Sequence, residues 1–328
     1  MKKIKFIGID VSSKTLDICI KSDGIRKSMV IANEQDRIRE FLSKNTGSES
    51  ELIIALENTG RYNWTLYEVF AETNLKVYVI SPLHLKKSMG LVRGKNDKID
   101  AVRIADFIEK NHQDITPWQT SSVSIQKLKV LLTERNYRIK LKRQLTSQKR
   151  DYKRMSNIGL EDDLTSLNTE MIENINKQIK ILEEKIQKLI ECDPQLKQKD
   201  KIIQSVPGVG KVLSWYFLSK TNAFTSITDP RKMACYAGVV PFEYQSGSSI
   251  YRKPQVSVFA DKLLKSLLHL GAMTAIRGKN DLREYYLRKV AEGKNKMSVL
   301  NAVRNKIILR VFAVVKNQKF YENNLTLS

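Results

Sequence analysis

Short apolar runs separated by turn-forming residues dominate the first third of the chain. The segments IKFIGID (4–10), TLDICI and RKSMVIAN, with VSSK and SDGI between them, predict three strands in a meander. Helical spacing follows at Ile38, Phe41 and Leu42, and ELIIALE and KVYVISP have the composition of two further strands. Helices are expected between and after these strands, over YNWTLYEVFAETN, HLKKSMGLV and DKIDAVRIADFIEKN. This order predicts an α/β unit, a mixed sheet with helices on its faces.

The pattern changes near residue 113 to long helices. Residues 122–155 form one mostly polar helix with apolar positions such as Leu128 and Leu132. A second helix carries apolar residues three and four apart, a seam typical of a coiled coil: Ile172, Ile175, Ile179, Leu182, Ile186 and Leu189. Two such helices predict a helical hairpin. It is either one arm of an intramolecular bundle or half of an intermolecular coiled coil.

The last third is predicted to be mostly helical. IIQSVPGVGKVLSWYFLS reads as a helix, a tight PGVG turn and a second helix, and residues 233–253 read as a loop-like region. Two further helices are expected at 258–276 and 296–316, linked by a basic segment. We therefore expect three domains: an α/β domain over 1–115, a helical hairpin over 116–198 and a C-terminal domain over 199–328.

The net charge of the chain limits the kinds of molecule that it is expected to bind. The 328 residues contain 57 Lys and Arg against 35 Asp and Glu, a net charge of +22, which predicts affinity for nucleic acid or an anionic membrane. Apolar runs such as VLSWYFL are much shorter than the roughly 18–20 residues of a membrane span, so no span is expected. Three cysteines without CxxC spacing argue against disulfides or a zinc knuckle and favour a reducing cytoplasm.

Four carboxylates occupy positions that favour a metal site. Asp10 and Glu57 end predicted strands, and Asp97 and Asp100 share one face at the start of a predicted helix. Adjacent strands and a helix packed on them can bring the four together. Converging carboxylates repel each other unless a hard cation such as Mg²⁺ binds them. The alternatives are that Asp10 is a turn residue and that Asp97 is a helix cap.

Several segments resemble the DEDD transposases of the insertion-sequence 110 family, known as bridge-RNA-guided recombinases. The similarity lies in GIDVSSKTLDICI, ALENTGRYNWTLYEVF, RGKNDKIDAVRIADF, VPGVG, MACYAGVVPFEYQSG and GKNKMSVLNAVRNKIILRVF, and so covers nearly the whole chain. The resemblance implies a ribonuclease-H-like (RuvC-like) first domain, a coiled-coil insertion and a C-terminal transposase domain with a nucleophilic serine. It also implies donor and target DNA, a structured guide RNA, and a homodimer or homotetramer.

The family's functional residues map onto definite positions. Its four metal-site acids fall on Asp10, Glu57, Asp97 and Asp100, which implies Mg²⁺, with Mn²⁺ as a substitute. Its serine falls on Ser246, before Gly247, where a phosphate has room to approach. Ser248 and Ser249 are the fallback nucleophiles, and the alternative is an ordinary polar loop. The segment 254–262 departs from the family pattern, which leaves the DNA contacts beyond the nucleophile unassigned.

Basic and glycine-rich positions predict nucleic-acid contacts. The run 138–154 contains eight Lys or Arg and one acid, and the PGVG glycines let backbone N–H groups approach a phosphate. The alternatives are a solvated helix face and an ordinary turn. The expected contact residues are Lys95, Arg138, Lys142, Arg143, Lys149, Arg150, Gly208, Gly210, Lys211, Arg252 and Lys253.

These expectations combine into one functional prediction with rivals. The chain is predicted to be an RNA-guided DNA recombinase that forms a phosphoserine intermediate with Mg²⁺-assisted chemistry, cytoplasmic and associated with the bacterial nucleoid. One rival is a RuvC-like endonuclease that uses water as the nucleophile. Another is a nucleic-acid-binding protein without catalysis. A fourth alternative is a sugar kinase, because GIDVSSKTLDICI resembles a phosphate-binding hairpin. The absence of a later Gly-rich nucleotide-binding motif argues against it.

Overall fold

The computed structural model describes residues 3–47, 50–88, 97–152, 154–155, 159–246 and 250–323. The chain forms two compact units, residues 1–120 and residues 121–328. The first unit ends close to the predicted boundary at 115. The helical hairpin and the C-terminal part share the second unit, so the division between them at 198 stays a prediction.

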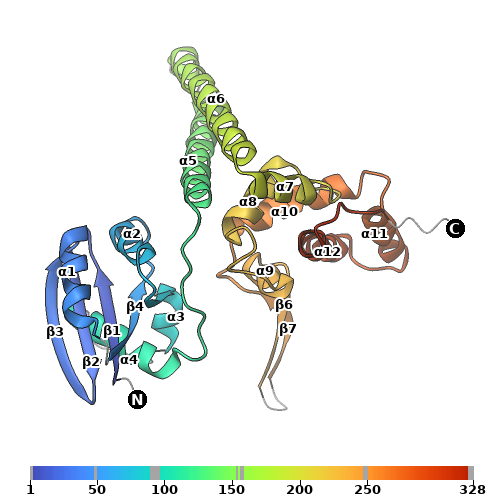
Figure 1. Cartoon of the computed structure of the whole chain (residues 1–328). Coiled ribbons are helices and arrows are strands. Elements are labelled where there is room, and N and C mark those ends of the chain that lie inside the picture. Colours follow the sequence, from blue (N-terminus) through green and yellow to red (C-terminus); the bar gives the residue numbers. More distant parts are fainter. Residues whose placement is uncertain are drawn as a thin grey trace. The chain divides into compact units, whose positions relative to one another are not determined.

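The first unit is built on a five-stranded mixed sheet of order β3-β2-β1-β4-β5 (Figure 1). Its strands are β1 (Lys3–Val11), β2 (Thr15–Ser22), β3 (Ile25–Ala32), β4 (Ser50–Glu57) and β5 (Lys76–Ile80). The first three strands pair antiparallel, whereas β4 pairs parallel with both β1 and β5. The predicted mixed α/β sheet is thus confirmed, with all five strands where the sequence pattern puts them.

Helices cover both faces of this sheet, because the central strands have apolar side chains on both faces. Alternate residues such as Ile9 and Leu56 pack against α1 (Gln35–Asn45) and α2 (Trp64–Ala71), which follows the short η1 turn (Gly60–Asn63). The other set, including Ile53 and Ala55, packs against α3 (Pro82–Ser88) and α4 (Asp97–Asn111). The face toward α4 is the one that carries the candidate acids.

Gly8 sets the distance between β1 and α4. A Cβ atom at this position would lie 2.2 Å from the carbonyl oxygen of Ala101 and 2.4 Å from the amide nitrogen of Ala105. Backbone atoms of a packed helix cannot move aside as a flexible side chain can. Glycine at position 8 therefore lets α4 lie directly against the strand that ends in Asp10.

Substituting Gly8 by alanine is expected to destabilise the first unit by about 1–3 kcal/mol, the usual cost of overpacking a dense interior. The added methyl group forces α4 away from β1. Urea unfolding followed by fluorescence measures the loss. Gly47→Ala is the matched control, because its Cβ would meet nothing closer than the Ser50 hydroxyl at 3.7 Å. A Gly8→Ala protein as stable as the Gly47→Ala protein would contradict the proposed packing.

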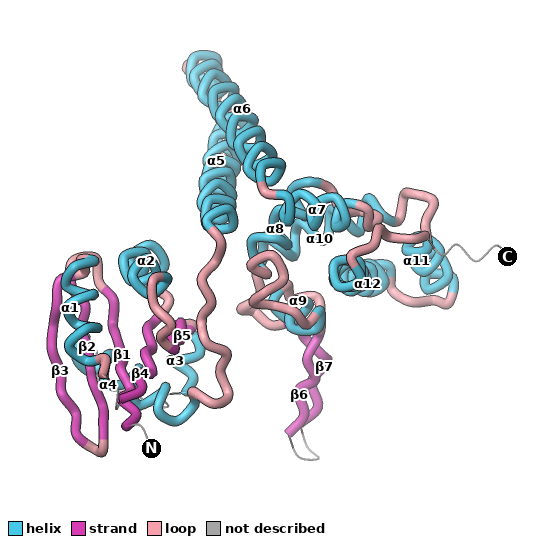
Figure 2. The backbone as a smooth tube through the Cα atoms, viewed as in Figure 1, coloured by secondary structure: helices cyan, strands magenta, loops and turns pink. Residues whose placement is uncertain are grey.

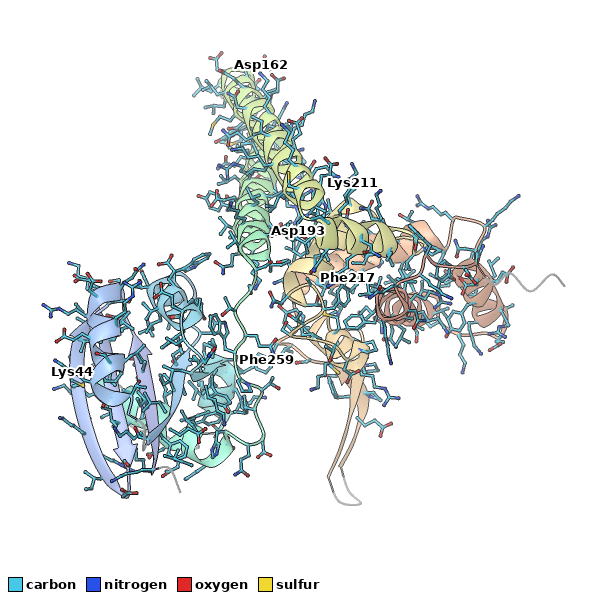
Figure 3. All side chains as sticks on the ribbon, viewed as in Figure 1. Lys44, Asp162, Asp193, Lys211, Phe217 and Phe259 are labelled. Carbon is cyan, nitrogen blue, oxygen red and sulfur yellow. The ribbon has the colours of Figure 1, made fainter. Side chains whose placement is uncertain are left out.

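The second unit begins with two long antiparallel helices, α5 (Val123–Tyr152) and α6 (Glu161–Cys192), which lie side by side (Figure 1). Figure 3 labels Asp162 and Asp193, at the two ends of α6. The predicted seam of α6 faces inward: Ile175 and Ile186 are buried, and the other four seam residues are half-buried. The predicted helical hairpin is therefore present.

The remaining helices surround one large core. They are α7 (Pro194–Gln204), α8 (Lys211–Lys220), α9 (Pro230–Tyr236), α10 (Lys262–Ala275), α11 (Asp281–Ala291) and α12 (Lys296–Asn317). Phe217, labelled in Figure 3, is fully buried in it, and Leu128, Leu132 and Ile186 join it from the base of the hairpin. No helix in the described ranges is long and apolar enough to cross a bilayer.

Two predictions for this part were incomplete. The region 233–253 contains the end of α9 and a two-stranded hairpin, β6 (Pro241–Ser246) and β7 (Ile250–Val256), instead of only loops (Figure 2). The basic segment before residue 296 contains α11, whose N-cap Asn280 accepts hydrogen bonds from the backbone of Leu282 and Arg283. Charged residues on an exposed helix hid its apolar face from the sequence pattern.

Candidate active site

Asp10 and Glu57 lie next to each other at the ends of two parallel strands. Ile9 is paired in register with Leu56, so the next residues, Asp10 and Glu57, stand at the same level on adjacent strands. Neighbouring strands are about 5 Å apart. Because side chains alternate along a strand, both acids share the face of Gly8 and Ala55, which is covered by α4. The predicted convergence of these two carboxylates at one sheet edge is therefore supported by the register.

The start of α4 reaches the same place. The Phe6 ring lies 5.2 Å from the ring of His112, just after α4, while Gly8 lies under Ala101 and Ala105. The helix thus runs antiparallel to β1. Two strand residues advance about 6.6 Å, which corresponds to about four helix residues. Asp10 is therefore opposite the first turn of α4, which contains Asp97 and Asp100.

The contacts of these acids differ. Asp100 is half-buried and forms an ion pair with Arg103, 2.7 Å between Oδ1 and Nη1. Asp10 Oδ1 accepts a hydrogen bond from the backbone N–H of Val11. The side chain of Asp97 lies outside the described residues. Within the ranges that the structure describes, no three His, Cys, Asp or Glu side chains approach closely enough to hold a metal ion.

Asp17 is a further carboxylate that sequence analysis passed over. It is paired with Asp10 across β1 and β2, on the face covered by α4. Directly opposed like charges destabilise a sheet unless other groups compensate them, and both of these acids have further interactions in the structure. The signal was available in TLDICI, where Leu16 and Ile18 are buried and Asp17 between them is half-buried.

The other end of α4 shows how acids on this face are normally balanced. Lys21 forms ion pairs with Asp106, at 2.8 Å, and with Glu109, and Arg26 also reaches Asp106, at 3.1 Å. These contacts raise the pKa of Lys21, mainly through the hydrogen bond to Asp106. Asp106 is therefore a structural acid, which makes it a useful comparison for the acids at the strand ends.

The candidate nucleophile lies in the second unit. Ser246 is the last residue of β6 and is paired with Ile250 at the start of β7. The side chains of Ser246, Arg252 and Lys253 lie outside the described residues, as do Gly247, Ser248 and Ser249 entirely. The backbone places Ser246 at the far end of a two-stranded hairpin (Figure 2).

A cluster of polar side chains holds the base of that hairpin. Lys220 Nζ is 2.8 Å from Asp261 Oδ2, and the Tyr236 hydroxyl lies 3.2 Å from the same oxygen. The backbone N–H of Asp261 also donates to the carbonyl of Tyr236. Burial opposes the charge on Asp261, but hydrogen bonds from the Leu264 backbone and from Lys220 hold the pKa of Asp261 below its usual value. Sequence analysis missed this cluster because its members are far apart in the chain.

The PGVG turn joins α7 to α8 and packs closely on α10. Gly208 has φ +85°, and a Cβ there would lie 2.2 Å from the carbonyl oxygen of Gly271. A groove of about 450 Å³ lies beside the turn, lined by residues that include Gly208, Gly210 and Lys211, the three predicted contacts. Behind it, the buried Asp200 accepts a hydrogen bond from the Ser214 hydroxyl, and burial raises the pKa of Asp200.

The predicted basic contacts on α5 differ in exposure. Within the α5–α6 helical hairpin, Arg138 donates hydrogen bonds to Gln178 and Glu134, and Lys149 donates one to the Thr169 hydroxyl. Arg143 and Arg150 are exposed, and Lys142 is half-buried. Lys95 lies outside the described residues. Exposed charge on α5 is thus concentrated toward its C-terminal half.

Comparison with known proteins gives two family matches. Residues 7–154 match the DEDD family of IS110, described as "Transposase", and residues 200–287 match the "Transposase IS116/IS110/IS902 family". The first match contains the sheet with its acids, and the second contains the PGVG turn and the hairpin with Ser246.

Several curated proteins are similar along the chain. The "Pilin gene-inverting protein" of Moraxella bovis is 26% identical over 98% of both chains. A "Putative transposase" of Sinorhizobium fredii is 24% identical over 94% of this chain and 83% of its own. An uncharacterized IS110 protein of Streptomyces coelicolor is 28% identical over 46% of this chain and 36% of its own. The chain therefore belongs to the IS110 family of transposases, a family of DNA recombinases.

Proposed function

We propose that this chain cleaves and rejoins DNA strands, with Ser246 as the attacking group and the carboxylates of the first unit as a metal site. The observation that carries the proposal is the register that puts Asp10 and Glu57 side by side beneath the start of α4. The strand order β3-β2-β1-β4-β5 is compatible with the ribonuclease-H-like fold that the sequence predicts. The apposed carboxylates favour catalysis over a purely binding role, because binding DNA alone does not require clustered negative charge.

The residues present fit a divalent metal. Carboxylate oxygens are hard donors, the ligands that Mg²⁺ prefers, and the strand register places Asp10 opposite Asp17 and level with Glu57. Asp10, Glu57 and Asp97 would hold the ion, and Asp100 would join them by exchanging its ion pair with Arg103 for the metal. When bound, Mg²⁺ would neutralise charge that develops on the phosphate oxygens.

The chain's own groups carry the transfer. The Ser246 oxygen forms a bond to phosphorus and loses its proton to solvent, while the bond from phosphorus to the leaving sugar oxygen breaks and that oxygen takes up a proton from solvent. The phosphodiester energy is conserved in the serine ester. A sugar hydroxyl of the new strand then attacks the ester and releases Ser246, so the exchange needs no ATP. Exposed cations such as Arg143 and Arg150 bind the backbone of the nucleic acid.

Two further partners belong to this proposal. A structured guide RNA would select donor and target DNA; the support is the family resemblance and the net charge of +22, which suits more than one polyanion. A second copy of the chain would pair along the α5–α6 hairpin. The support is a groove of about 510 Å³ lined by Leu141, Leu145 and Met171, with Met171 and Leu167 more than half exposed.

Removal of divalent ions tests the metal assignment. With EDTA, strand cleavage of a supercoiled plasmid that carries the chain's own recombination sites is expected to stop, and Mg²⁺ or Mn²⁺ is expected to restore it. DNA binding should persist in EDTA, because the basic residues need no metal. Cleavage at an undiminished rate in EDTA would contradict the metal site.

A further inference from the structure

Arg304 is a buried cation that has no anionic partner among the residues that the structure describes. It lies in the middle of α12 with 8% of its surface exposed, and it forms no ion pair with any described carboxylate. Its Nη2 lies 2.6 Å from Nδ1 of His269, its Nη1 is 3.4 Å from Oδ1 of Asn301, and its Nε has no hydrogen-bond partner in the described residues. Burying an unpaired charge is costly, so such a charge needs an explanation in the function of the protein.

In the described part of the chain, the helices that meet at Arg304 provide no acid as a counter-ion. The three helices that meet here, α9, α10 and α12, contain no Asp or Glu in their sequences. Asp261, which caps α10, is already held by Lys220, and Asp229 caps α9. The buried charge of Arg304 therefore has no counter-ion among the described residues.

His269 on α10 is half-buried and contacts the Arg304 guanidinium. The guanidinium can only donate hydrogen bonds, so Nδ1 of His269 must accept, and the proton of the neutral imidazole must be on Nε2. Partial burial and the charge of Arg304 both lower the pKa of His269, which keeps the ring in this neutral form. His269 is thereby fixed as a hydrogen-bond donor whose free N–H faces away from Arg304.

The position of this pair relates it to the hairpin that carries Ser246. Asn301, one turn from Arg304, donates from Nδ2 to the carbonyl of Val239, two residues before β6 begins. Lys265, one turn before His269 on the same face of α10, passes 3.8 Å from the place a Cβ of Gly238 would take. From this base, β6 carries the chain about 20 Å to Ser246.

We propose that His269 and Lys265, with Arg304 behind them, bind a phosphate of the DNA backbone at the base of the nucleophile hairpin. The phosphate would accept a hydrogen bond from Nε2 of His269 and an ion pair from Lys265, and it would supply the anion that Arg304 lacks. DNA phosphates recur every few ångströms, so one duplex can reach both this site and Ser246. The site holds DNA and takes no part in bond breaking. The inference rests on the proposed action on DNA.

Two substitutions of His269 distinguish the roles of its two ring nitrogens. Asparagine puts an acceptor where Nδ1 was and removes the outward donor, whereas glutamine keeps a donor at the place of Nε2. His269→Asn is expected to weaken binding of a labelled DNA duplex about tenfold, as lost charge-assisted contacts do. The slope of log affinity against log salt should stay close to that of the wild type, because the neutral ring contributes no charge. His269→Gln should stay near the wild-type affinity.

Arg304→Met adds a second test, because protein stability and DNA affinity are expected to respond differently to it. Removing a buried unpaired charge should leave the urea unfolding midpoint unchanged or raise it, while DNA affinity falls about tenfold. A purely structural arginine would give the reverse: a lower midpoint and wild-type affinity. All binding is measured by fluorescence anisotropy in EDTA, so the result does not depend on cleavage.

The outcomes distinguish this inference from the proposed function. Wild-type affinity in both His269→Asn and Arg304→Met would overturn the phosphate site alone. Failure of the wild-type chain to bind any duplex would overturn the site together with the proposed action on DNA. Because the chain has three histidines, ¹⁵N NMR of labelled histidine can also test the Nε2–H tautomer of His269. A ring protonated on Nδ1 would contradict the arrangement.

Discussion

Replacing Ser246 by alanine is expected to abolish both the covalent DNA–protein adduct and strand exchange. The hydroxyl is the group that would bond to phosphorus, and alanine has no oxygen to take its place. Denaturing gels of labelled DNA incubated with the protein detect the adduct, and an inversion or integration assay measures exchange. DNA binding by the variant should equal that of the wild type, since the change removes one atom from the end of a hairpin.

Ser248→Ala and Ser249→Ala are the matched controls for this experiment. Both serines are close to Ser246 in the sequence, so a general effect of altering this region would appear in them too. We expect both to form the adduct. An adduct with Ser246→Ala and none with Ser248→Ala would move the nucleophile to Ser248. Nicking without any adduct in the wild type would instead favour water as the attacking group.

Asp10→Asn is expected to reduce strand cleavage by about 10³-fold, because losing a metal ligand costs several kcal/mol of transition-state stabilisation. The substitution keeps size and shape, and the acceptor of the Val11 N–H remains. Cleavage rates at saturating Mg²⁺ give the size of the effect. Affinity for DNA should not fall, and removing a negative charge near the phosphate is expected to raise it slightly.

Asp106→Asn provides the comparison for Asp10→Asn. Asp106 is also an acid on the α4 side of the sheet, but Lys21 and Arg26 already neutralise it. Its loss should cost a little stability and leave cleavage within a few-fold of the wild type. Equal losses of cleavage in the two variants would mean that Asp10 acts through the fold and not through a metal.

The spacing of apolar residues predicted the first unit well, because each of its strands and helices shows its buried face within a short stretch of sequence. The strands alternate between two buried faces, and the residues of α4 recur at helical spacing, so the pattern alone predicts the mixed sheet. Helix α11 was missed because its apolar residues pack on one face against distant helices, and the strands β6 and β7 were missed because polar and charged residues interrupt their apolar ones. Phe242 and Leu287, for example, are exposed, which weakens the signal in the sequence.

The candidate site was predictable in part. Asp10 and Glu57 could be identified because each follows a strong apolar strand, and parallel pairing then brings them together. Asp17 is found only from the register of β1 with β2. Arg304 and His269 are 35 positions apart, and neither lies in a motif with known spacing. Contacts of this kind arise from helix packing, which a single sequence does not encode in a readable pattern.

The hairpin β6–β7 has a thermodynamic consequence for when this chain can react. It is a sheet of two strands, and a pair of strands on its own is barely stable in water. Its outer backbone groups have no partner strand within the described part of the sheet. On the proposed function, contacts with DNA or with another copy of the chain would supply the free energy that holds Ser246 in place for the reaction. Recognition and reactivity would be linked in this way, and an unbound chain would be protected from cutting DNA at random.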